Sequence, residues 1–207
     1  MKLLFINVSI RPDIVWKQFP VGLGYIMTAA KDAGFEFDCL DIDINDFSDQ
    51  YVENFFAKNT YDVIAFGTIV THYKWSKWLI HTIKEHQPHC TVIVGNSVGE
   101  SIPEILFART PVDIVVLGEG DVTIVEVLDA IDKGSPLGRA VEPEVPVLHI
   151  NGSYPATIMG EGIKGICFRD GKNRVVNTGK RKAVRILDDI PFPDWDIIDA
   201  ERYIRSA

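Results

Sequence analysis

Four short segments of this chain combine glycine with small hydrogen-bonding residues, and each follows an apolar run of strand length. Gly118–Asp121 reads Gly-Glu-Gly-Asp after the run Val112–Leu117, and Gly95–Ser97 reads Gly-Asn-Ser after Thr91–Val94. Glycine at a strand exit is either ordinary turn chemistry or room for a large group to approach the backbone. Together, the segments predict a site for a large, flat or extended ligand.

The other two segments follow the first and third apolar runs. The third run, Tyr61–Gly67, is followed by hydroxyl and imidazole side chains at Thr68, Thr71, His72 and Tyr73. The first run is followed by residues 9–25, which is long for a loop between a strand and a helix and therefore suggests a function. Within it, Pro20 precedes Gly22-Leu23-Gly24, a stiff entry to a helix whose start can come close to a ligand.

Strands and helices alternate along the first two thirds of the chain. The apolar runs predict strands at Lys2–Val8, Phe35–Asp41, Tyr61–Gly67, Thr91–Val94 and Val112–Leu117. Helical spacing predicts helices at Val21–Ala33, Ser48–Lys58, Trp75–His86, Gly99–Ala108 and Asp121–Asp132. Continuously apolar strands are typical of a parallel sheet covered on both faces. The prediction is an α/β protein: a flavodoxin-like (Rossmann-like), doubly wound sheet of five parallel strands in the order 2-1-3-4-5. The carboxyl ends of such strands meet at one edge, where ligands bind.

The chain changes character after Gly134. Residues 134–155 are rich in proline and glycine, which is typical of a linker. Residues 162–179 contain two short strand patterns around Asp170-Gly171, which predicts a β-hairpin. The tail then carries two prolines and a helical end, and is expected to pack on the sheet or to lead into a further domain.

Composition excludes several classes of protein. A net charge of -8 and a pI of about 5.1 argue against a nucleic-acid partner. The basic cluster Lys180–Arg185 is predicted to be a solvated loop. Cys39, Cys90 and Cys167 lack metal-ligand spacing, so they are expected to be small buried side chains of a cytoplasmic protein. No apolar run reaches the length of a membrane span, and the N-terminus reads as a strand, not a signal peptide.

Three other functions known on this type of sheet lack the residues they need. A flavodoxin needs a phosphate loop rich in hydroxyls and glycine after the first strand, where this chain has Ser9–Asp13. A phospho-receiver domain needs an aspartate at the end of the third strand, where this chain has Ala65–Gly67. The dinucleotide fingerprint G-x-G-x-x-G is missing after the first strand.

Taken together, the segments resemble a known family. The P-x-G-L-G-Y turn at Pro20–Tyr25, the G-E-G at Gly118–Gly120 and the P-F-P-x-W-D at Pro191–Asp196 look like the N-terminal cobalamin-binding domain of radical S-adenosylmethionine enzymes and its connector. The resemblance covers nearly the whole chain. It implies a cobalamin-binding domain at 1–135, then a linker, a hairpin and a connector at 136–207 toward a radical domain.

The resemblance also implies where the cofactor lies: the corrin ring over the carboxyl edge of the sheet, and the nucleotide tail between sheet and helices. The implied cofactor-binding residues are Ser9, Arg11, Pro20, Gly22, Leu23, Gly24, Tyr25, Thr68, Thr71, His72, Tyr73, Gly95, Asn96, Ser97, Gly118, Glu119 and Gly120. Pro20–Tyr25 and Thr68–Tyr73 would face the ring. Thr68 and Gly95–Ser97 would line the tail channel, and Gly118–Gly120 would support the ring edge or the tail.

Two departures from the family pattern stand out. Methionine-synthase-like domains carry D-x-H-x-x-G after the first strand, whose histidine ligates cobalt; here that loop reads Ser9-Ile10-Arg11-Pro12-Asp13, so no protein histidine is expected below the metal. Asn96 stands where a second glycine often follows the fourth strand, which narrows the tail channel.

Several side chains allow two interpretations. Glu119 either supports the cofactor or accepts backbone hydrogen bonds at the next helix. His72 is either a lower cobalt ligand or a hydrogen-bonding surface residue. Trp75 and Trp78 have helical spacing and are either core residues or a stack for the cofactor. Trp16 could lie against the corrin face or against another domain.

Radical chemistry needs C-x-x-x-C-x-x-C for a [4Fe–4S] cluster, and this sequence has no such motif. The resemblance therefore implies the cobalamin-binding part of a larger enzyme, whose cluster and S-adenosylmethionine site lie in a downstream domain. Cobalamin-dependent relatives include methyltransferases. The alternative is a flavodoxin-like interaction module that has lost the cofactor. Five apolar tail residues are expected to be exposed without a partner domain and to favour dimer formation: Ile190, Phe192, Trp195, Ile197 and Ile198.

Overall fold

A computed structural model describes residues 1–11, 16–141, 157–186 and 190–206. Its centre is a sheet whose first five strands are parallel: β1 (Leu3–Asn7), β2 (Phe37–Asp41), β3 (Val63–Gly67), β4 (Thr91–Gly95) and β5 (Ile114–Val116). They lie in the order 2-1-3-4-5, as predicted. β1, β3, β4 and β5 are almost wholly buried, because helices cover both faces of the sheet.

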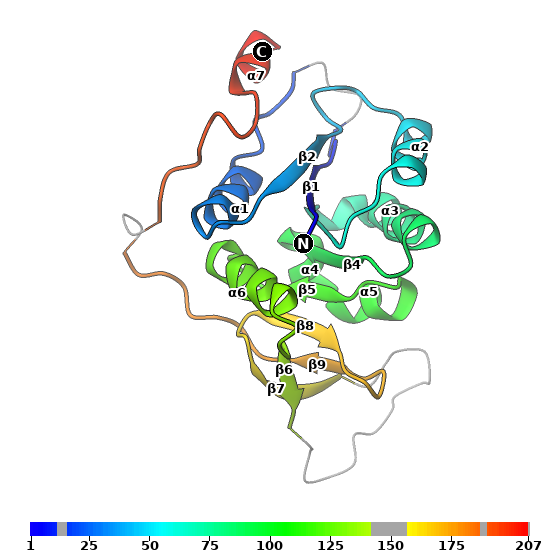
Figure 1. Cartoon of the computed structure of the whole chain (residues 1–207), viewed down its shortest axis with the longest axis vertical. Coiled ribbons are helices and arrows are strands. Elements are labelled where there is room, and N and C mark those ends of the chain that lie inside the picture. The colour runs from blue at the N-terminus through cyan, green and yellow to red at the C-terminus, as the bar shows by residue number, and fades with distance from the viewer. Residues whose placement is uncertain (12–15, 142–156, 187–189, 207) are drawn as a thin grey trace.

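The helices divide between the two faces of the sheet. α1 (Val21–Asp32) and α6 (Asp121–Asp132) pack side by side on one face (Figure 1). The other face carries α2 (Asp49–Lys58), the 3-10 turn η1 (Val70–His72), α3 (Tyr73–His86), α4 (Asn96–Ser101) and α5 (Pro103–Arg109). Each face buries its own apolar core, so the α1/α6 face and the α2/α3/α5 face are separate packing units.

Local signals account for most helix boundaries. The Ser48 hydroxyl accepts a hydrogen bond from the backbone N–H of Tyr51 at 3.2 Å, which caps α2 where the sequence predicts its start. The prediction of one helix over Gly99–Ala108 is wrong, because the segment divides into α4 and α5 at Ile102. Pro103 lacks a backbone N–H and begins α5 at its first position.

The five-stranded sheet is also corrected, because the sheet of the described residues has nine strands. The expected hairpin forms from β8 (Ile166–Arg169) and β9 (Val175–Asn177), and β8 pairs antiparallel with β5. β7 (Thr157–Gly162) and β6 (Gly138–Ala140) continue the sheet beyond β9. Without the hairpin, β5 would be an edge strand with unpaired backbone N–H and C=O groups. Strand β8 of the hairpin forms hydrogen bonds with these groups. β6 lies within the predicted linker, while residues 142–156 are outside the described part.

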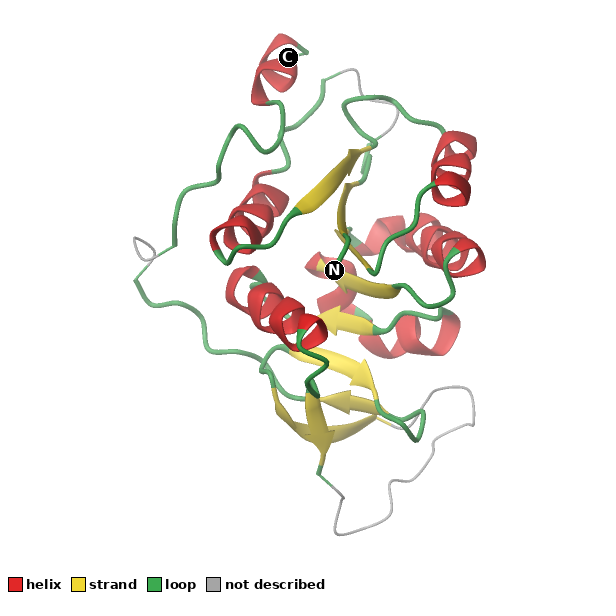
Figure 2. Cartoon of the chain, in the orientation of Figure 1, coloured by secondary structure: helices red, strands yellow, loops and turns green. Residues whose placement is uncertain are grey.

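The C-terminal segment returns across the α1/α6 face to the far end of the sheet (Figures 1 and 2). It runs along α1, where Asp194 forms an ion pair with Lys31 and its backbone N–H donates to the Thr28 hydroxyl at 2.8 Å. It ends in α7 (Ala200–Arg205), beside the carboxyl ends of β1 and β2. Residues at the two ends of the sequence therefore meet at one edge of the sheet.

Burial corrects three expectations about individual side chains. Cys90 and Cys167 are buried as predicted, but Cys39 is exposed because β2 is an edge strand. In the tail, Phe192 and Trp195 are exposed, whereas Ile198 is buried in the core. Arg181, in the basic cluster, forms an ion pair with Glu126 on α6.

Among the described residues, no helix is long and apolar enough to cross a membrane.

Candidate ligand-binding site

A cavity of about 650 Å³ opens between α1 and α6 at the carboxyl ends of the parallel strands. Its floor consists of apolar side chains from β1, β3, β4 and β5, and its walls come from the first turns of α1 and α6. The lining residues are Phe5, Ile6, Asn7, Val8, Ile10, Pro20, Val21, Gly22, Leu23, Tyr25, Ile26, Ala65, Phe66, Gly67, Ile93, Gly95, Asn96, Val116, Gly118, Glu119, Gly120, Asp121, Ile124 and Ile190. The volume lies within the range of small-molecule sites, which bind mostly through apolar walls and few polar groups.

About half of the predicted site residues line this cavity. These are Pro20, Gly22, Leu23, Tyr25, Gly95, Asn96, Gly118, Glu119 and Gly120. They come from three loops that are far apart in the sequence, and the parallel sheet brings them to one edge. The structure places the other eight elsewhere: Ser9, Arg11, Gly24, Thr68, Thr71, His72, Tyr73 and Ser97.

The Gly-Glu-Gly segment forms the rim beside α6, and its two glycines serve different purposes. Gly118 has a φ of +74°, a conformation that other residues adopt only with strain. Gly120 has an ordinary φ, but a Cβ there would lie 2.8 Å from Cδ1 of Ile26, inside the cavity. Gly118 is therefore required by the turn, whereas Gly120 keeps the space beside Ile26 open. Glu119 is exposed at the rim, and no side chain hydrogen bond caps α6, so the proposed capping role of Glu119 is not observed.

The Pro20–Tyr25 motif has two faces. Gly22, Leu23 and Tyr25 line the cavity, but Gly24 is buried on the other side of α1. A Cβ on Gly24 would lie 3.3 Å from Cβ of Pro193, so this glycine makes room for the C-terminal segment. The motif Pro20–Tyr25 and the motif Pro191–Asp196 therefore pack against each other, which their spacing in the sequence does not reveal.

The loop after β3 packs on the opposite face of the sheet from the cavity. The Thr68 side chain is fully buried and shares a 2.7 Å hydrogen bond with Ser76 of α3. Thr71 is exposed, and His72 stacks on Trp75 with ring centroids 5.4 Å apart. The Thr68 hydroxyl is thus used in the contact between its loop and α3. Thr68 is not among the cavity residues.

In the loop after β4, Asn96 adopts a backbone conformation that is typical of glycine. Asn96 has a φ of 63°, and asparagine is one of the few residues that tolerate this region. Its side-chain oxygen accepts a 2.6 Å hydrogen bond from the backbone N–H of Ser97, so the side chain stays next to the cavity wall. This arrangement explains how a larger residue is accommodated at the rim.

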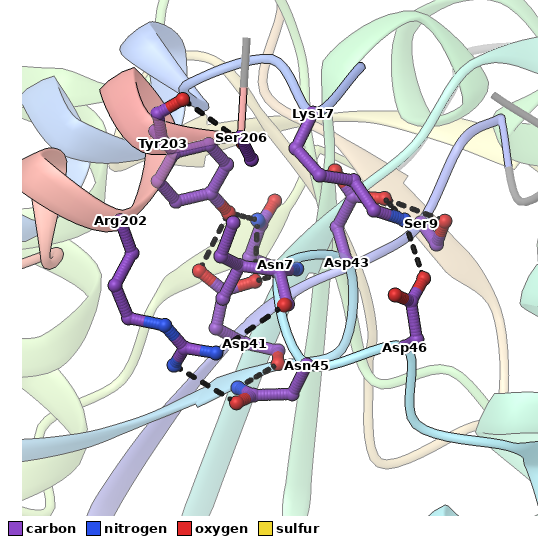
Figure 3. A network of polar contacts seen from close by, with 11 residues as sticks. Asn7, Ser9, Lys17, Asp41, Asp43, Asn45, Asp46, Arg202, Tyr203 and Ser206 are labelled. Carbon is purple, nitrogen blue, oxygen red and sulfur yellow. Dashed lines mark hydrogen bonds and ion pairs between the residues drawn. The ribbon is translucent and has the colours of Figure 1, made fainter. Parts of the chain in front are cut away.

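The loop after β1 takes part in a charged network at the sheet edge (Figure 3). The Ser9 hydroxyl donates to Asp43 at 2.6 Å, and the Lys17 ammonium lies 2.5 Å from an Asp46 oxygen and 3.5 Å from Asp43. Arg11 is exposed. The network fixes this loop against the β2–α2 turn, so Ser9 has a structural partner. Part of the loop, residues 12–15, lies outside the described residues.

The tryptophans lie away from the cavity wall. Trp75 and Trp78 are half-buried against the core of the α2/α3 face, and the Trp75 indole N–H donates to Asp49 at 2.9 Å. Of the two interpretations, core residues or a stack for the cofactor, the first therefore describes both tryptophans. Trp16 is 67% exposed, and it is not among the cavity residues.

Three of the lining residues that sequence reasoning missed matter most for the shape and polarity of the cavity. Ile26 of α1 stands opposite Gly120, and Ile190 reaches the cavity from the C-terminal segment. Asn7 ends β1, where a polar side chain interrupts an apolar strand. Only Asn7 had a visible signal, because a buried polar residue at the carboxyl end of a parallel strand faces the ligand edge.

The burial of His72 gives the protein a pH-dependent stability. Partial desolvation lowers the pKa of His72 from its ordinary value of 6.5, and Nδ1 is buried without a hydrogen-bond partner among the described residues. The unfolded chain then binds this proton at a higher pH than the folded chain. The free energy of unfolding should therefore decrease as the pH falls below about 6.5 and level off below the folded-state pKa.

Urea denaturation of wild type and His72→Asn between pH 7.5 and 5 measures this effect. The variant should lose part of the pH dependence in that window. Identical slopes for the two proteins would contradict the assignment to His72.

Comparisons with known proteins add to this geometry. A family model described as "B12 binding domain" matches residues 15–128, more than half of the chain. An uncharacterized methyltransferase of Pyrococcus horikoshii is 24% identical over 188 residues, covering 89% of this chain and 35% of that protein. The anaerobic magnesium-protoporphyrin IX monomethyl ester cyclase of Rubrivivax gelatinosus is 22% identical over 210 residues, covering 99% and 34%. The chain thus spans about a third of these relatives.

Solved structures share the fold. The cobalamin-dependent S-adenosylmethionine radical enzyme OxsB, with aqua-cobalamin and S-adenosylmethionine bound, matches 99% of this chain and 25% of its own, with a TM-score of 0.72 and 14% identity. The radical S-adenosylmethionine methyltransferase TsrM of Kitasatospora setae, with cobalamin and a [4Fe–4S] cluster, matches 89% and 30%, with a TM-score of 0.63 and 19% identity.

Proposed function

The chain belongs to the B12-binding domain family, and from this premise we propose that it binds cobalamin at the carboxyl edge of its parallel strands. The corrin ring lies across the rim formed by Pro20–Tyr25 and Gly118–Gly120, and the nucleotide tail enters the cavity between α1 and α6. The observation that carries the proposal is the cavity itself: about 650 Å³, apolar, and bordered by glycines at the strand exits.

The residues present fit such a ligand. A side chain at Gly120 would meet Ile26 and fill space that the structure leaves open. The first turns of α1 and α6 both border the cavity, and no side chain caps either of them. Free backbone N–H groups of a helix N-terminus are hydrogen-bond donors for a ligand. An apolar cavity with donors at its rim suits a large organic cofactor with polar side groups.

The protein's role in this proposal is to bind, orient and shield. Cobalamin, when bound, supplies the chemistry of carrying a methyl group. Phe5, Ala65, Ile93 and Val116 form an apolar floor that excludes water from the buried tail. We propose that no histidine of the described residues ligates the metal from below, since none lines the cavity and His72 packs with α3 on the other face of the sheet.

We further propose that the chain acts within a larger enzyme. Residues 1–135 would bind cobalamin and residues 136–207 would connect to a radical domain that holds the [4Fe–4S] cluster and S-adenosylmethionine. The support is that the chain spans about a third of relatives that include an uncharacterized methyltransferase. Dimer formation through exposed Phe192 and Trp195 stays a prediction.

Mixing the protein with hydroxocobalamin, desalting it and recording its absorption spectrum tests the proposal. The expected result is retention of a corrinoid band at close to one equivalent per chain. A colourless protein would reject cobalamin binding and favour a flavodoxin-like interaction module that has lost its cofactor.

A further inference from the structure

A hydrogen-bond cluster joins the C-terminal helix to the ends of β1 and β2 (Figure 3). Tyr203 of α7 is 3% exposed, and its ring lies 5.5 Å from that of Phe19, centroid to centroid. Its hydroxyl lies 2.6 Å from Oδ2 of Asp41 at the end of β2 and 2.7 Å from Nδ2 of Asn7 at the end of β1. The cluster therefore connects a residue near the end of the chain to a residue that lines the cavity.

The chemistry of the cluster fixes the direction of each hydrogen bond. A carboxylate only accepts, so the Tyr203 hydroxyl donates to Asp41 and must accept from Asn7. Burial and the bond to Asp41 raise the pKa of Tyr203 far above its ordinary value, so the phenol keeps its proton at neutral pH. Asn7 Nδ2 also donates to Asp41 Oδ1 at 2.9 Å. Both amide hydrogens of Asn7 are thus used, and a flip of its amide would turn Oδ1 toward the Asp41 carboxylate, which cannot donate, and would cost the bond to Tyr203 in its present direction.

The remaining polar atom of Asn7 is its carbonyl oxygen. Within the described part of the chain, Oδ1 of Asn7 has no hydrogen-bond partner. Asn7 is only 7% exposed, yet it lines an otherwise apolar part of the cavity, beside Phe5 and Val8. Oδ1 is not among the buried polar atoms of the described residues, so it keeps accessible surface, and its place in the cavity lining lets a ligand or a water molecule donate to it.

We propose that Asn7 is a specificity residue that accepts a hydrogen bond from a side-chain amide N–H of the corrinoid, and that Tyr203 is a positioning residue that holds the Asn7 amide in this orientation. The proposal rests on the proposed function and deepens it, because it names the ligand group that is recognised. An amide offers N–H donors, whereas a carboxylate in its place offers only acceptors and would oppose Oδ1. The site should therefore discriminate amide from acid.

Corrinoids in which one side-chain amide is hydrolysed to a carboxylic acid provide the probe. Dissociation constants for hydroxocobalamin and for each singly hydrolysed derivative are measured with wild type, Tyr203→Phe and Asn7→Ala. Wild type should bind hydroxocobalamin about three- to tenfold more tightly than one of the derivatives, the worth of one neutral hydrogen bond. Asn7→Ala should lose this preference, and Tyr203→Phe should reduce it, because Asp41 alone then orients the Asn7 amide.

Tyr51→Phe is the matched control, since Tyr51 is 44% exposed on α2 and its ring stacks on Phe47. It should keep the wild-type preference. A purely structural role of Tyr203 would weaken binding of all corrinoids equally and leave the preference intact, which would overturn the proposal. Asn7→Ala answers the same question should Tyr203→Phe unfold, as judged by thermal denaturation.

The outcomes also separate this proposal from the function on which it rests. If wild type binds no corrinoid, the proposed function is wrong and the role of Asn7 falls with it. If wild type binds hydroxocobalamin and all acid derivatives equally, cobalamin binding stands and the role of Asn7 is rejected.

Discussion

Replacement of Gly120 with leucine is expected to remove most of the cobalamin that wild type retains, while leaving the domain folded. The backbone at Gly120 has an ordinary φ of -101°, so a side chain brings no backbone strain. Its Cβ would point at Cδ1 of Ile26, 2.8 Å away, and the end of that flexible side chain can move. The leucine would then occupy the space between α1 and α6 that we assign to the nucleotide tail. A bound tail would then overpack this space at a cost of roughly 2 kcal/mol or more, which weakens the affinity at least about 30-fold.

Gly171→Leu provides the matched control for this experiment. Gly171 lies in the β8–β9 turn, a Cβ there meets nothing within 4 Å, and the cavity is lined by other residues. After mixing with hydroxocobalamin and desalting, Gly171→Leu should keep the corrinoid band of wild type, and Gly120→Leu should lose most of it. Circular dichroism should show both variants folded. A full band in folded Gly120→Leu would mean that Gly120 is only a turn residue.

Phe5→Ala is expected to produce a large loss of stability. Phe5 sits in the middle of β1, is fully buried and packs edge-to-face on Phe37 with ring centroids 5.0 Å apart. It also forms part of the cavity floor. Removing a buried phenylalanine side chain costs about 3–5 kcal/mol, from lost burial and from the void that remains. Domains of this kind are stabilised by only about 5–15 kcal/mol, so the variant should be close to unfolding.

The measurement is the free energy of unfolding from urea denaturation, without ligand. Phe192→Ala is the control, because Phe192 is 83% exposed and its truncation should change stability by less than about 0.5 kcal/mol. A loss below about 1 kcal/mol in Phe5→Ala would contradict the central position of β1 in the core.

Much of the fold could be predicted because its local signals are strong. Apolar runs placed all five parallel strands, and the pattern of Asp121–Asp132 gave the limits of α6. The misses come from interactions between distant segments. β8 continues the sheet because β5 has an unpaired edge, and nothing within residues 166–169 shows which edge they will join. Cys39 is exposed because β2 is an edge strand, although its run alternates like a half-buried one.

The candidate site was predictable in part for the same reason. Strand exits with glycine could be read from the sequence, and a parallel sheet necessarily gathers them at one edge. The sequence did not indicate on which face of the sheet the cavity opens. Thr68 was therefore expected to line the tail channel, but its side chain is buried against Ser76 on the opposite face. Gly24 was expected to face the ligand, but it packs against Pro193 of the C-terminal segment.

The sequence alone determined the alternation of strands and helices, the strand order and the resemblance to cobalamin-binding domains. These depend on periodicity and short motifs, which act over a few residues. Only the tertiary structure decided the face on which the cavity opens, the addition of the hairpin to β5 and the contact of Tyr203 with Asn7. Asn7 and Tyr203 are 196 residues apart in the sequence, and such contacts are selected by the packing of the whole chain rather than by any local preference.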